Sequence, residues 1–330
     1  MDRINIGIVG TGWWASVHAN AIKKGKFLKL VACYSRTKEK AKEFAVKNDC
    51  EVVSDYMSLI KRTDIDAIII TTPHTTHPEL AIKAAQAGKH VLIEKPLALN
   101  VKDCKRIIEA FEDAGLVLAV GHDRRWYGSH MKMKELIEKG VIGKKIFGEG
   151  NYFHYSGLKL TPDLWRWYKS ESPGGSLSYL GIHMIDTLRF LIGEIVEVNG
   201  KVDKLETKAE IYDTALATFR FDNGAYGFVG SIFVVPKVTM VNVYGTKASL
   251  YSSDKLGLYI QRIESEELEK IQYNEVDPVL LEQEDFARSV IEKRKPLVDG
   301  YEGMRNVAIM EAIIKSSQDK RPVEVREILN

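Results

Sequence analysis

Short apolar runs alternate with amphipathic segments over the first part of the chain. Runs that predict strands lie at residues 4–9, 28–34, 66–71, 91–93 and 117–120. Segments with helical periodicity lie between them, at 17–24, 38–47, 77–87 and 101–114. This alternation is typical of a parallel sheet covered by helices, so we predict a doubly wound α/β domain of Rossmann type over residues 1–121.

The pattern changes after residue 121. Between 196 and 273 the sequence predicts successive strands joined by turn signals such as the Asp-Asn-Gly at 222–224. Sequential strands with short turns form an antiparallel or mixed sheet, so residues 122–330 predict an α+β domain with a large open sheet. Helices are expected at 130–139, 176–191, 282–292 and 303–316.

Composition narrows the classes of function. The chain has 330 residues, and 47 Lys and Arg against 45 Asp and Glu leave a formal net charge of +2. This balance gives no field strong enough to hold nucleic acid or an anionic membrane non-specifically, and no apolar run approaches the length of a membrane span. Cys33, Cys50 and Cys104 are scattered, so we expect no disulfide framework and no metal site. With no signal-peptide pattern at the start, a reducing cytoplasm is the expected compartment.

A glycine-rich turn joins the first predicted strand to the first predicted helix. Residues 10–15, GTGWWA, match the dinucleotide-binding pattern G-x-G-x-x-G/A in the structural context that gives the pattern its meaning. Gly10 permits a tight turn, Gly12 lets the backbone approach a pyrophosphate, and the small Ala15 lets the helix pack on the strand. The alternative is a glycine turn that binds nothing, with the two tryptophans packing in the protein. The residues expected at the cofactor are Gly10, Gly12, Trp13 and Trp14.

The end of the second predicted strand bears on the choice of cofactor. NAD-binding chains carry an Asp or Glu there for the ribose 2′-hydroxyl, whereas this chain has Ser35, Arg36 and Thr37. A guanidinium and two hydroxyls suit a 2′-phosphate, and Lys40 adds a second cation one helical turn later. We therefore expect NADP to be preferred over NAD. Alternatively, Arg36 stacks on the adenine or lies in solvent.

Two polar segments follow the third and fourth predicted strands, at the carboxyl edge where doubly wound sheets bind ligands. The first is TTPHTTH at residues 71–77, and the second is Glu94-Lys95-Pro96. A lysine immediately before proline is held in an extended conformation, although a lone lysine here is also an ordinary surface charge. The residues expected at the cofactor from these segments are Thr72, Pro73, His74, His77, Glu94 and Lys95.

Three segments carry a family resemblance: GIVGTGWWASVHANAI, TTPHTTHPELAIKAAQAGKHVLIEKPLA and GGSLSYLGIHMIDTL. In order and spacing the chain resembles the glucose-fructose oxidoreductase / inositol dehydrogenase / rhizopine catabolism (Gfo/Idh/MocA) family. The resemblance implies an NAD(P)-dependent dehydrogenase or reductase acting on sugars, cyclitols and related polyols. It also implies a homodimer or homotetramer assembled through the open sheet of the second domain.

The resemblance implies roles for individual residues. Lys95 would lie beside the nicotinamide and the substrate, and Trp165-Arg166 resembles a Trp-Arg segment that lines the family's pocket. Independently of the resemblance, Arg124 and Arg125, just past the fifth predicted strand, are either domain-junction ion pairs or substrate contacts. The family's second catalytic element is an Asp followed four residues later by His; here the His is His183, but Tyr179 occupies the Asp position.

The substitution at position 179 leaves two interpretations of the acid/base. Residues four apart share one face of a helix, and Asp186 at three residues from His183 is close enough to orient it. A neutral Tyr179 would make His183 a weaker proton acceptor than in the usual pair. Alternatively Tyr179 transfers the proton itself, with its pKa pulled down from about 10 by Lys95. The structural alternative is a core histidine satisfied by Asp186 and an ordinary packed aromatic.

These observations predict an NADP-preferring oxidoreductase for a small polyhydroxylated substrate. A hydride would move between nicotinamide C4 and a secondary alcohol or ketone. Lys95 would stabilise the substrate oxygen and relay a proton, with His183 or Tyr179 as the acid/base. Two other functions stay open: a non-catalytic NAD(P)-binding sensor, and an enzyme that cleaves glycosides by transient oxidation without net redox change.

Overall fold

The computed structural model describes residues 3–265 and 267–330, which form two compact units. The first unit comprises the chain up to Asp123 together with Asp277–Met304, and the second comprises Arg124–Val276 with Arg305–Asn330. The first change of unit lies close to the expected boundary at residue 121. The segment Asp277–Met304, expected in the second domain, packs in the first unit.

The first unit contains a six-stranded, fully parallel sheet in the order β3-β2-β1-β4-β5-β6. The predicted doubly wound sheet is therefore confirmed. The sequence pattern missed β3, because its two residues are exposed and form no apolar run. The strands are β1 (Ile4–Val9), β2 (Leu28–Tyr34), β3 (Glu51–Val52), β4 (Ala67–Ile70), β5 (His90–Glu94) and β6 (Leu118–Gly121).

The helices of this unit are α1 (Trp13–Lys24), α2 (Lys38–Asn48), α3 (Tyr56–Ile60), α4 (His77–Gln86), α5 (Val101–Asp113) and α8 (Pro278–Glu292). Their starts carry recognisable signals. The side chain of Asn100 accepts a hydrogen bond from Asp103 N at 2.8 Å and begins α5, and Asp277 caps α8, which has Pro278 in its first turn.

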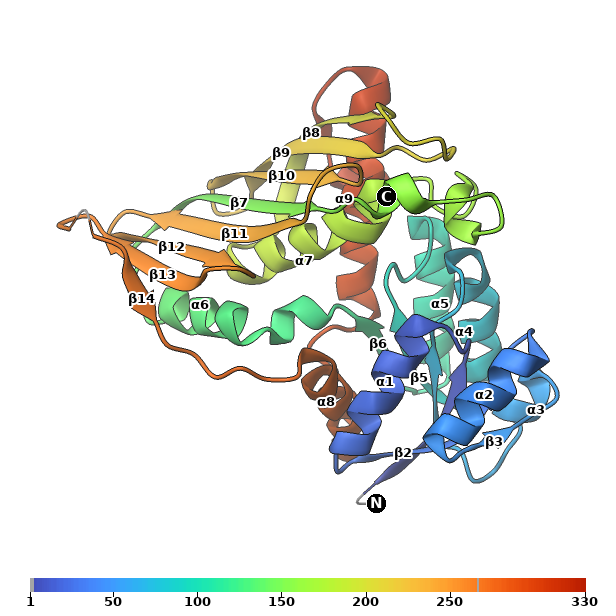
Figure 1. The fold of residues 1–330 in the computed structure, drawn as a ribbon. Coiled ribbons are helices and arrows are strands. Elements are labelled where there is room, and N and C mark those ends of the chain that lie inside the picture. Colours follow the sequence, from blue (N-terminus) through green and yellow to red (C-terminus); the bar gives the residue numbers. More distant parts are fainter. Residues whose placement is uncertain (1–2, 266) are drawn as a thin grey trace. The chain divides into compact units, whose positions relative to one another are not determined.

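Helix α8 belongs to the first unit because its apolar face completes that core. Phe286 and Ala287 are fully buried in one cluster with Ile4, Ile6 and Ile8 of β1. Helix α1 contributes to the same cluster and packs against α8, as Figure 1 shows. A helix near the end of the chain therefore covers the sheet that begins it.

The second unit contains a nine-stranded mixed sheet in the order β14-β13-β12-β11-β7-β10-β9-β8-β15. Neighbouring strands are antiparallel except β7 and β10, which are parallel. The predicted α+β domain with a large mixed sheet is confirmed. The strands are β7 (Lys145–Phe153), β8 (Ile195–Asp203), β9 (Thr214–Phe221), β10 (Tyr226–Ile232), β11 (Val238–Gly245), β12 (Ala248–Ser253), β13 (Gly257–Arg262), β14 (Glu269–Ile271) and β15 (Val323–Glu324).

Helix α7 (Ile182–Leu191) lies against one face of this sheet (Figure 1). Its close approach depends on two glycines of β7. A Cβ at Gly148 would lie 2.0 Å from Ile192 Cδ1, and a Cβ at Gly150 would lie 3.0 Å from Met184 Cβ. Larger residues at these positions would push the helix off the sheet. The other helices of this unit are α6 (Gly128–Glu138), α10 (Arg326–Leu329) and the part of α9 (Gly300–Asp319) beyond residue 304.

Among the described residues, no helix combines the length and apolarity needed to cross a membrane.

Candidate active site

The glycine turn between β1 and α1 has the geometry that its sequence predicts. Gly10 has φ +88°, and its N–H donates to Tyr34 O at 2.9 Å. A Cβ at Gly10 would lie 2.9 Å from Thr71 Oγ1, so both the backbone conformation and the space require glycine. Ala15 is fully buried, as expected for a small residue where the helix packs on the sheet.

Gly12 stands at the start of α1 and plays a different role. A Cβ at this position would meet no described atom within 4 Å, so packing within the protein does not require glycine here. No side chain caps this helix start, and its first turn carries no acidic residue. The positive end of α1 is therefore accessible and unneutralised, which suits a phosphate group.

Two tryptophans stand at the accessible start of α1. Trp13 is 77% exposed and stacks on Trp14, with ring centroids 5.0 Å apart and 21° between the planes. Trp14 in turn packs against the edge of His18 at 6.1 Å. Trp13 is thus a surface aromatic beside the phosphate-binding turn, rather than a core residue.

The residues predicted to select the cofactor follow β2. Ser35 is partly exposed, and Arg36, Thr37 and Lys40 are exposed. Among the described residues, no ion pair involves Arg36 or Lys40. Both cations are therefore available to an anionic ligand.

The segments after β4 and β5 are joined through His77. Its ring is fully buried, with Nδ1 2.9 Å from Pro96 O and Nε2 3.1 Å from Thr72 O. Burial lowers the pKa of His77, so the ring is neutral near pH 7. The sequence placed His77 at the cofactor, but its ring has no exposed surface and instead supports the two loops. His74 is also buried, with its ring 5.7 Å from that of His77, whereas Thr72 and Pro73 are partly exposed.

Glu94 and Lys95 point to different environments. The Glu94 carboxylate is buried; Oε1 lies 2.8 Å from His18 Nε2, and Oε2 accepts from the backbone N–H of Lys95 at 3.3 Å. The prediction placed Glu94 at the cofactor, yet these contacts lie within the protein. Lys95 is partly exposed, and its peptide bond to Pro96 is cis.

In the second unit, Tyr179 lies in an aromatic cluster. Its ring stacks on Phe233, with centroids 5.3 Å apart, and tilts against Trp165 at 6.1 Å. Burial raises the pKa of Tyr179 to about 12, and the opposing effects of Ser172 and Arg166 are smaller. The expected lowering of the Tyr179 pKa is therefore wrong, because the effect of burial is larger than that of the neighbouring Arg166 guanidinium.

His183 is buried in the first turn of α7, with its ring 6.0 Å from that of Tyr152. The turn before it, Leu177–Gly181, is π-helical and contains Tyr179. Because π-helical bonds join residues five apart, the two residues are not separated by one regular α-helical turn as their spacing predicted. Tyr152 was not predicted; it shares a face of β7 with Gly148 and Gly150, and that alternation is the signal that could have placed it toward α7.

Asp186 has partners that its spacing in the sequence did not suggest. It is fully buried, and Oδ1 accepts from Arg125 Nη2 at 2.7 Å and from Asn306 Nδ2 at 2.7 Å, while Oδ2 accepts from Arg125 Nε at 2.9 Å. Arg125 therefore forms one of the ion pairs that were considered for this region. Asn306 also accepts from Arg189, which extends the buried network.

Two arginines of this unit stack on aromatic rings. Arg124 is buried, with its guanidinium 4.4 Å from the ring centre of Tyr152 and 4.9 Å from that of Tyr127. Arg166 is exposed and lies 4.6 Å from Trp165 and 5.6 Å from Tyr179. The predicted substrate residues Trp165, Arg166 and Tyr179 are thus neighbours, and Arg124 is close to His183 through Tyr152.

Both parts of the chain match the same family. Residues 4–122 match the family model described as the NAD-binding Rossmann fold of an oxidoreductase family, and residues 134–325 match its C-terminal alpha/beta domain. The chain belongs to the Gfo/Idh/MocA oxidoreductase family. The resemblance carried by the three segments is confirmed, and this Gfo/Idh/MocA protein is an NAD(P)-dependent oxidoreductase.

Individual relatives of this Gfo/Idh/MocA protein cover its whole length. Myo-inositol 2-dehydrogenase of Thermotoga maritima is 29% identical over 344 aligned residues, covering 99% of this chain and 100% of the relative. A putative NADPH-dependent oxidoreductase from Desulfitobacterium hafniense has a similar structure, with a TM-score of 0.94, 31% identity and full coverage of both chains. Levoglucosan dehydrogenase in complex with NADH shares the fold, with a TM-score of 0.90 and 24% identity over 98% of this chain and 99% of the other.

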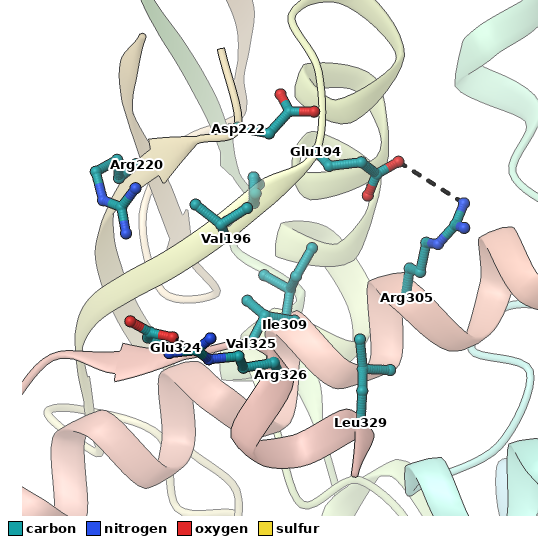
Figure 2. Close-up of a pocket in the computed structure, with 11 residues that line it drawn as sticks. Glu194, Val196, Arg220, Asp222, Arg305, Ile309, Glu324, Val325, Arg326 and Leu329 are labelled. Atoms are coloured by element: carbon teal, nitrogen blue, oxygen red, sulfur yellow. Dashed lines mark ion pairs between the residues drawn. The ribbon is translucent and has the colours of Figure 1, made fainter. Parts of the chain in front are cut away.

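A hollow of about 560 Å³ lies in the second unit of this Gfo/Idh/MocA protein, and none of the predicted site residues lines it (Figure 2). Ile309 and Leu329 line it, and Arg305, which also lines it, pairs with Glu194 at 3.8 Å. Within residues 3–265 and 267–330, no group of three or more His, Cys, Asp or Glu side chains is placed to hold a metal ion.

Proposed function

We propose that this protein is an NADP-preferring oxidoreductase that transfers a hydride between nicotinamide C4 and a secondary alcohol or ketone of a sugar, cyclitol or related polyol. The names of its relatives support this substrate class: myo-inositol 2-dehydrogenase, levoglucosan dehydrogenase, and the 1,5-anhydro-D-fructose reductase of Ensifer adhaerens, which is 28% identical over 90% of this chain. The observation that carries the proposal is the Glu94-Lys95-Pro96 segment at the carboxyl end of β5, in the unit that contains the glycine turn.

The test is the change in nicotinamide absorbance when the purified protein meets NADP(H) and a panel of sugars, cyclitols and their keto forms. We expect turnover with at least one member of the panel. Cofactor binding without any turnover would contradict the proposal and favour a sensor. Cleavage of a chromogenic glycoside without net change in absorbance would favour the eliminating reaction.

The residues of the first unit fit a dinucleotide. The accessible start of α1, the space left by Gly12 and the conformation of Gly10 together form a phosphate-binding turn. The backbone N–H groups of this turn would hold the pyrophosphate. When bound, the nicotinamide supplies the donor or acceptor of the hydride.

In this proposal Lys95 stabilises the substrate oxygen. Its ammonium donates a hydrogen bond to the oxygen on which negative charge develops as the alcohol is oxidised or the ketone reduced. Partial exposure at the end of β5 leaves the side chain able to meet a ligand, while the backbone on both sides is held by buried contacts. Because the backbone on both sides of Lys95 is held in place, the Lys95 ammonium does not have to move into position during the reaction.

We assign the acid/base role to His183 and give Tyr179 a supporting role. An imidazole has one ring nitrogen that donates a proton and one that accepts, whereas a phenol with a pKa of about 12 keeps its proton at pH 7. Tyr179 can still donate a hydrogen bond to a substrate oxygen. The ring of Tyr179 and the adjoining Trp165 offer aromatic faces that suit the CH surfaces of a sugar.

The preference for NADP is assigned to Arg36, supported by Ser35, Thr37 and Lys40. Replacement of Arg36 by alanine is expected to lower the ratio of NADP affinity to NAD affinity by about 10- to 100-fold, since a charge-assisted hydrogen bond contributes about 1.5–3 kcal/mol. Titration of both cofactors against both proteins measures the ratio. The exposed Lys42 on α2 provides the matched control, because Lys42→Ala removes a charge without this effect. An unchanged ratio in the Arg36 variant would remove the argument for NADP.

The open face of the second sheet is proposed to join copies of the chain into a dimer or tetramer. Tyr226 of β10 is 60% exposed, and Leu216 of β9 and Val238 of β11 are exposed on the same face of the sheet, nearer the other end of β10. Exposed apolar side chains on a broad sheet favour association with a matching surface. A native mass measurement is expected to give a multiple of 37.3 kDa, reduced by Tyr226→Glu. A mass of one chain at micromolar concentration would contradict this assembly.

A further inference from the structure

A buried histidine on α1 connects the catalytic segment to the last helix of the first unit. His18 is 1% exposed, and its Nε2 lies 2.8 Å from Glu94 Oε1. On the other side of the ring, the amide nitrogen of the fully buried Gln283 lies 2.8 Å from His18 Nδ1. Three residues that are distant in the sequence thus form one continuous hydrogen-bonded chain.

The surrounding atoms determine the direction of these hydrogen bonds. The amide nitrogen of Gln283 also lies 3.1 Å from the backbone oxygen of His18, which can only accept. The NH₂ group must therefore face His18, and it donates to both the carbonyl and Nδ1. A ring that accepts at Nδ1 carries its proton on Nε2, so His18 donates to the Glu94 carboxylate.

Glu94 links the ring of His18 to the backbone of Lys95. Its Oε2 accepts from the Lys95 backbone N–H, and its Oε1 lies beside Gly121 of the neighbouring strand. A Cβ at Gly121 would lie 3.0 Å from Glu94 Oε1, so the carboxylate fills the space that this glycine leaves. The carboxylate therefore has one position, set by His18, Gly121 and the backbone that follows it.

The far side of Lys95 is held by a second buried histidine. His77 lies between two backbone carbonyls, with Nδ1 2.9 Å from Pro96 O and Nε2 3.1 Å from Thr72 O. The neutral ring carries a single N–H, which donates to one of these two oxygens. Lys95 is thus preceded by a residue fixed from α1 and α8, and followed by a residue fixed from α4. The two histidines reach the segment from different helices, and both are shielded from solvent.

We propose that His18, oriented by Gln283 and acting through Glu94, is a positioning residue for Lys95. The inference rests on the proposed role of Lys95. The hydrogen bonds that join Gln283, His18 and Glu94 keep the Lys95 ammonium where it can contact the substrate oxygen. Loss of the His18–Glu94 hydrogen bond therefore lowers kcat more than it changes KM or cofactor affinity. A misplacement of about 1 Å at a reacting group costs about a hundredfold in rate.

Two amide substitutions at position 18 test this with matched polarity. In His18→Gln the side-chain amide reaches the place of Nε2 and can still donate to Glu94, whereas in His18→Asn it reaches only the place of Nδ1. We expect His18→Asn to lower kcat by about 10- to 100-fold and His18→Gln to retain most of it, with NADP affinity similar in both. Equal kcat values for the two variants would overturn the proposal. An increase in KM with kcat unchanged would overturn it as well.

His90 is the matched structural control, since it lies at the opposite end of β5 and accepts a hydrogen bond from Val117 N at 2.9 Å. His90→Gln is expected to leave kcat unchanged, and a loss equal to that of His18→Asn would overturn the proposal. If His18→Asn does not fold, Gln283→Leu removes the amide that orients the ring and is expected to lower kcat severalfold with KM unchanged. Absence of turnover in the wild-type protein would refute the proposed function, and turnover near the wild-type level in Lys95→Ala would refute the catalytic role of Lys95. A dead Lys95 variant beside an unaffected His18→Asn would refute only the positioning role.

Discussion

Replacement of Lys95 by alanine is expected to lower kcat by about a thousandfold or more while NADP affinity stays within an order of magnitude. The substitution removes the cation that stabilises the developing negative charge, and loss of one such donor costs about 10²–10³ in rate. Participation in proton transfer adds to that loss. Steady-state kinetics with the best substrate, together with titration of NADPH fluorescence, separates the two effects.

The control for charge is Lys102→Ala, because Lys102 is exposed in the first turn of α5, the helix that follows the Lys95 segment. This variant is expected to turn over normally. Lys95→Arg keeps the positive charge but changes its geometry, and it should remain strongly impaired. Turnover near the wild-type level in Lys95→Ala would show that the residue has no catalytic role.

Tyr179→Phe decides between the two acid/base candidates in the same assay. The variant keeps the ring that stacks on Phe233 and removes only the hydroxyl. Since burial raises the pKa of Tyr179 to about 12, we expect kcat to change by less than about tenfold. A loss of about a thousandfold with the fold intact would transfer the acid/base role from His183 to Tyr179.

Replacement of Asp186 by asparagine is expected to lower the free energy of unfolding by about 3–5 kcal/mol. The substitution leaves the buried guanidinium of Arg125 without its counter-charge, and it presents an amide to Asn306, which also donates. A loss of this size lowers the thermal midpoint by roughly 6–20 °C for a unit of this length. Thermal unfolding followed by circular dichroism measures the change.

Two further variants show whether the buried charge is the cause. Arg125→Leu combined with Asp186→Leu removes both charges, so it should be less destabilising than the sum of the single changes. Glu138→Gln breaks an exposed ion pair with Lys134 and is expected to change the midpoint little. Strict additivity of the double variant would contradict the explanation.

The first half of the site could be predicted because its signals are local. The glycine turn, the strand before it and the helix after it all lie within residues 4–24, and the carboxyl ends of β4 and β5 follow from the order of the strands. The helix that carries His183 was also predictable from its apolar character. What failed was its geometry, since no residue type marks the π-helical turn around Tyr179.

Partners that are distant in sequence could not be predicted. The spacing of His183 and Asp186 suggested a local pair, and it gave no sign that Asp186 binds Arg125, 61 residues away. His18 contacts Glu94 across 76 residues and Gln283 across 265, and neither separation leaves a periodic signal. Burial is decided by tertiary packing, which is also why the side chains of Glu94 and His77 turned inward from an edge that the sequence assigned to the cofactor.

The division of the chain has a consequence for its synthesis. The core around Ile4, Ile6 and Ile8 needs Phe286 and Ala287, which a ribosome adds only after the whole of Arg124–Val276. Domains usually fold in the order in which they emerge. Here the apolar face that α8 covers stays exposed on the nascent first unit until α8 has been synthesised. The time taken to translate Arg124–Val276 therefore sets how long that face is available to chaperones.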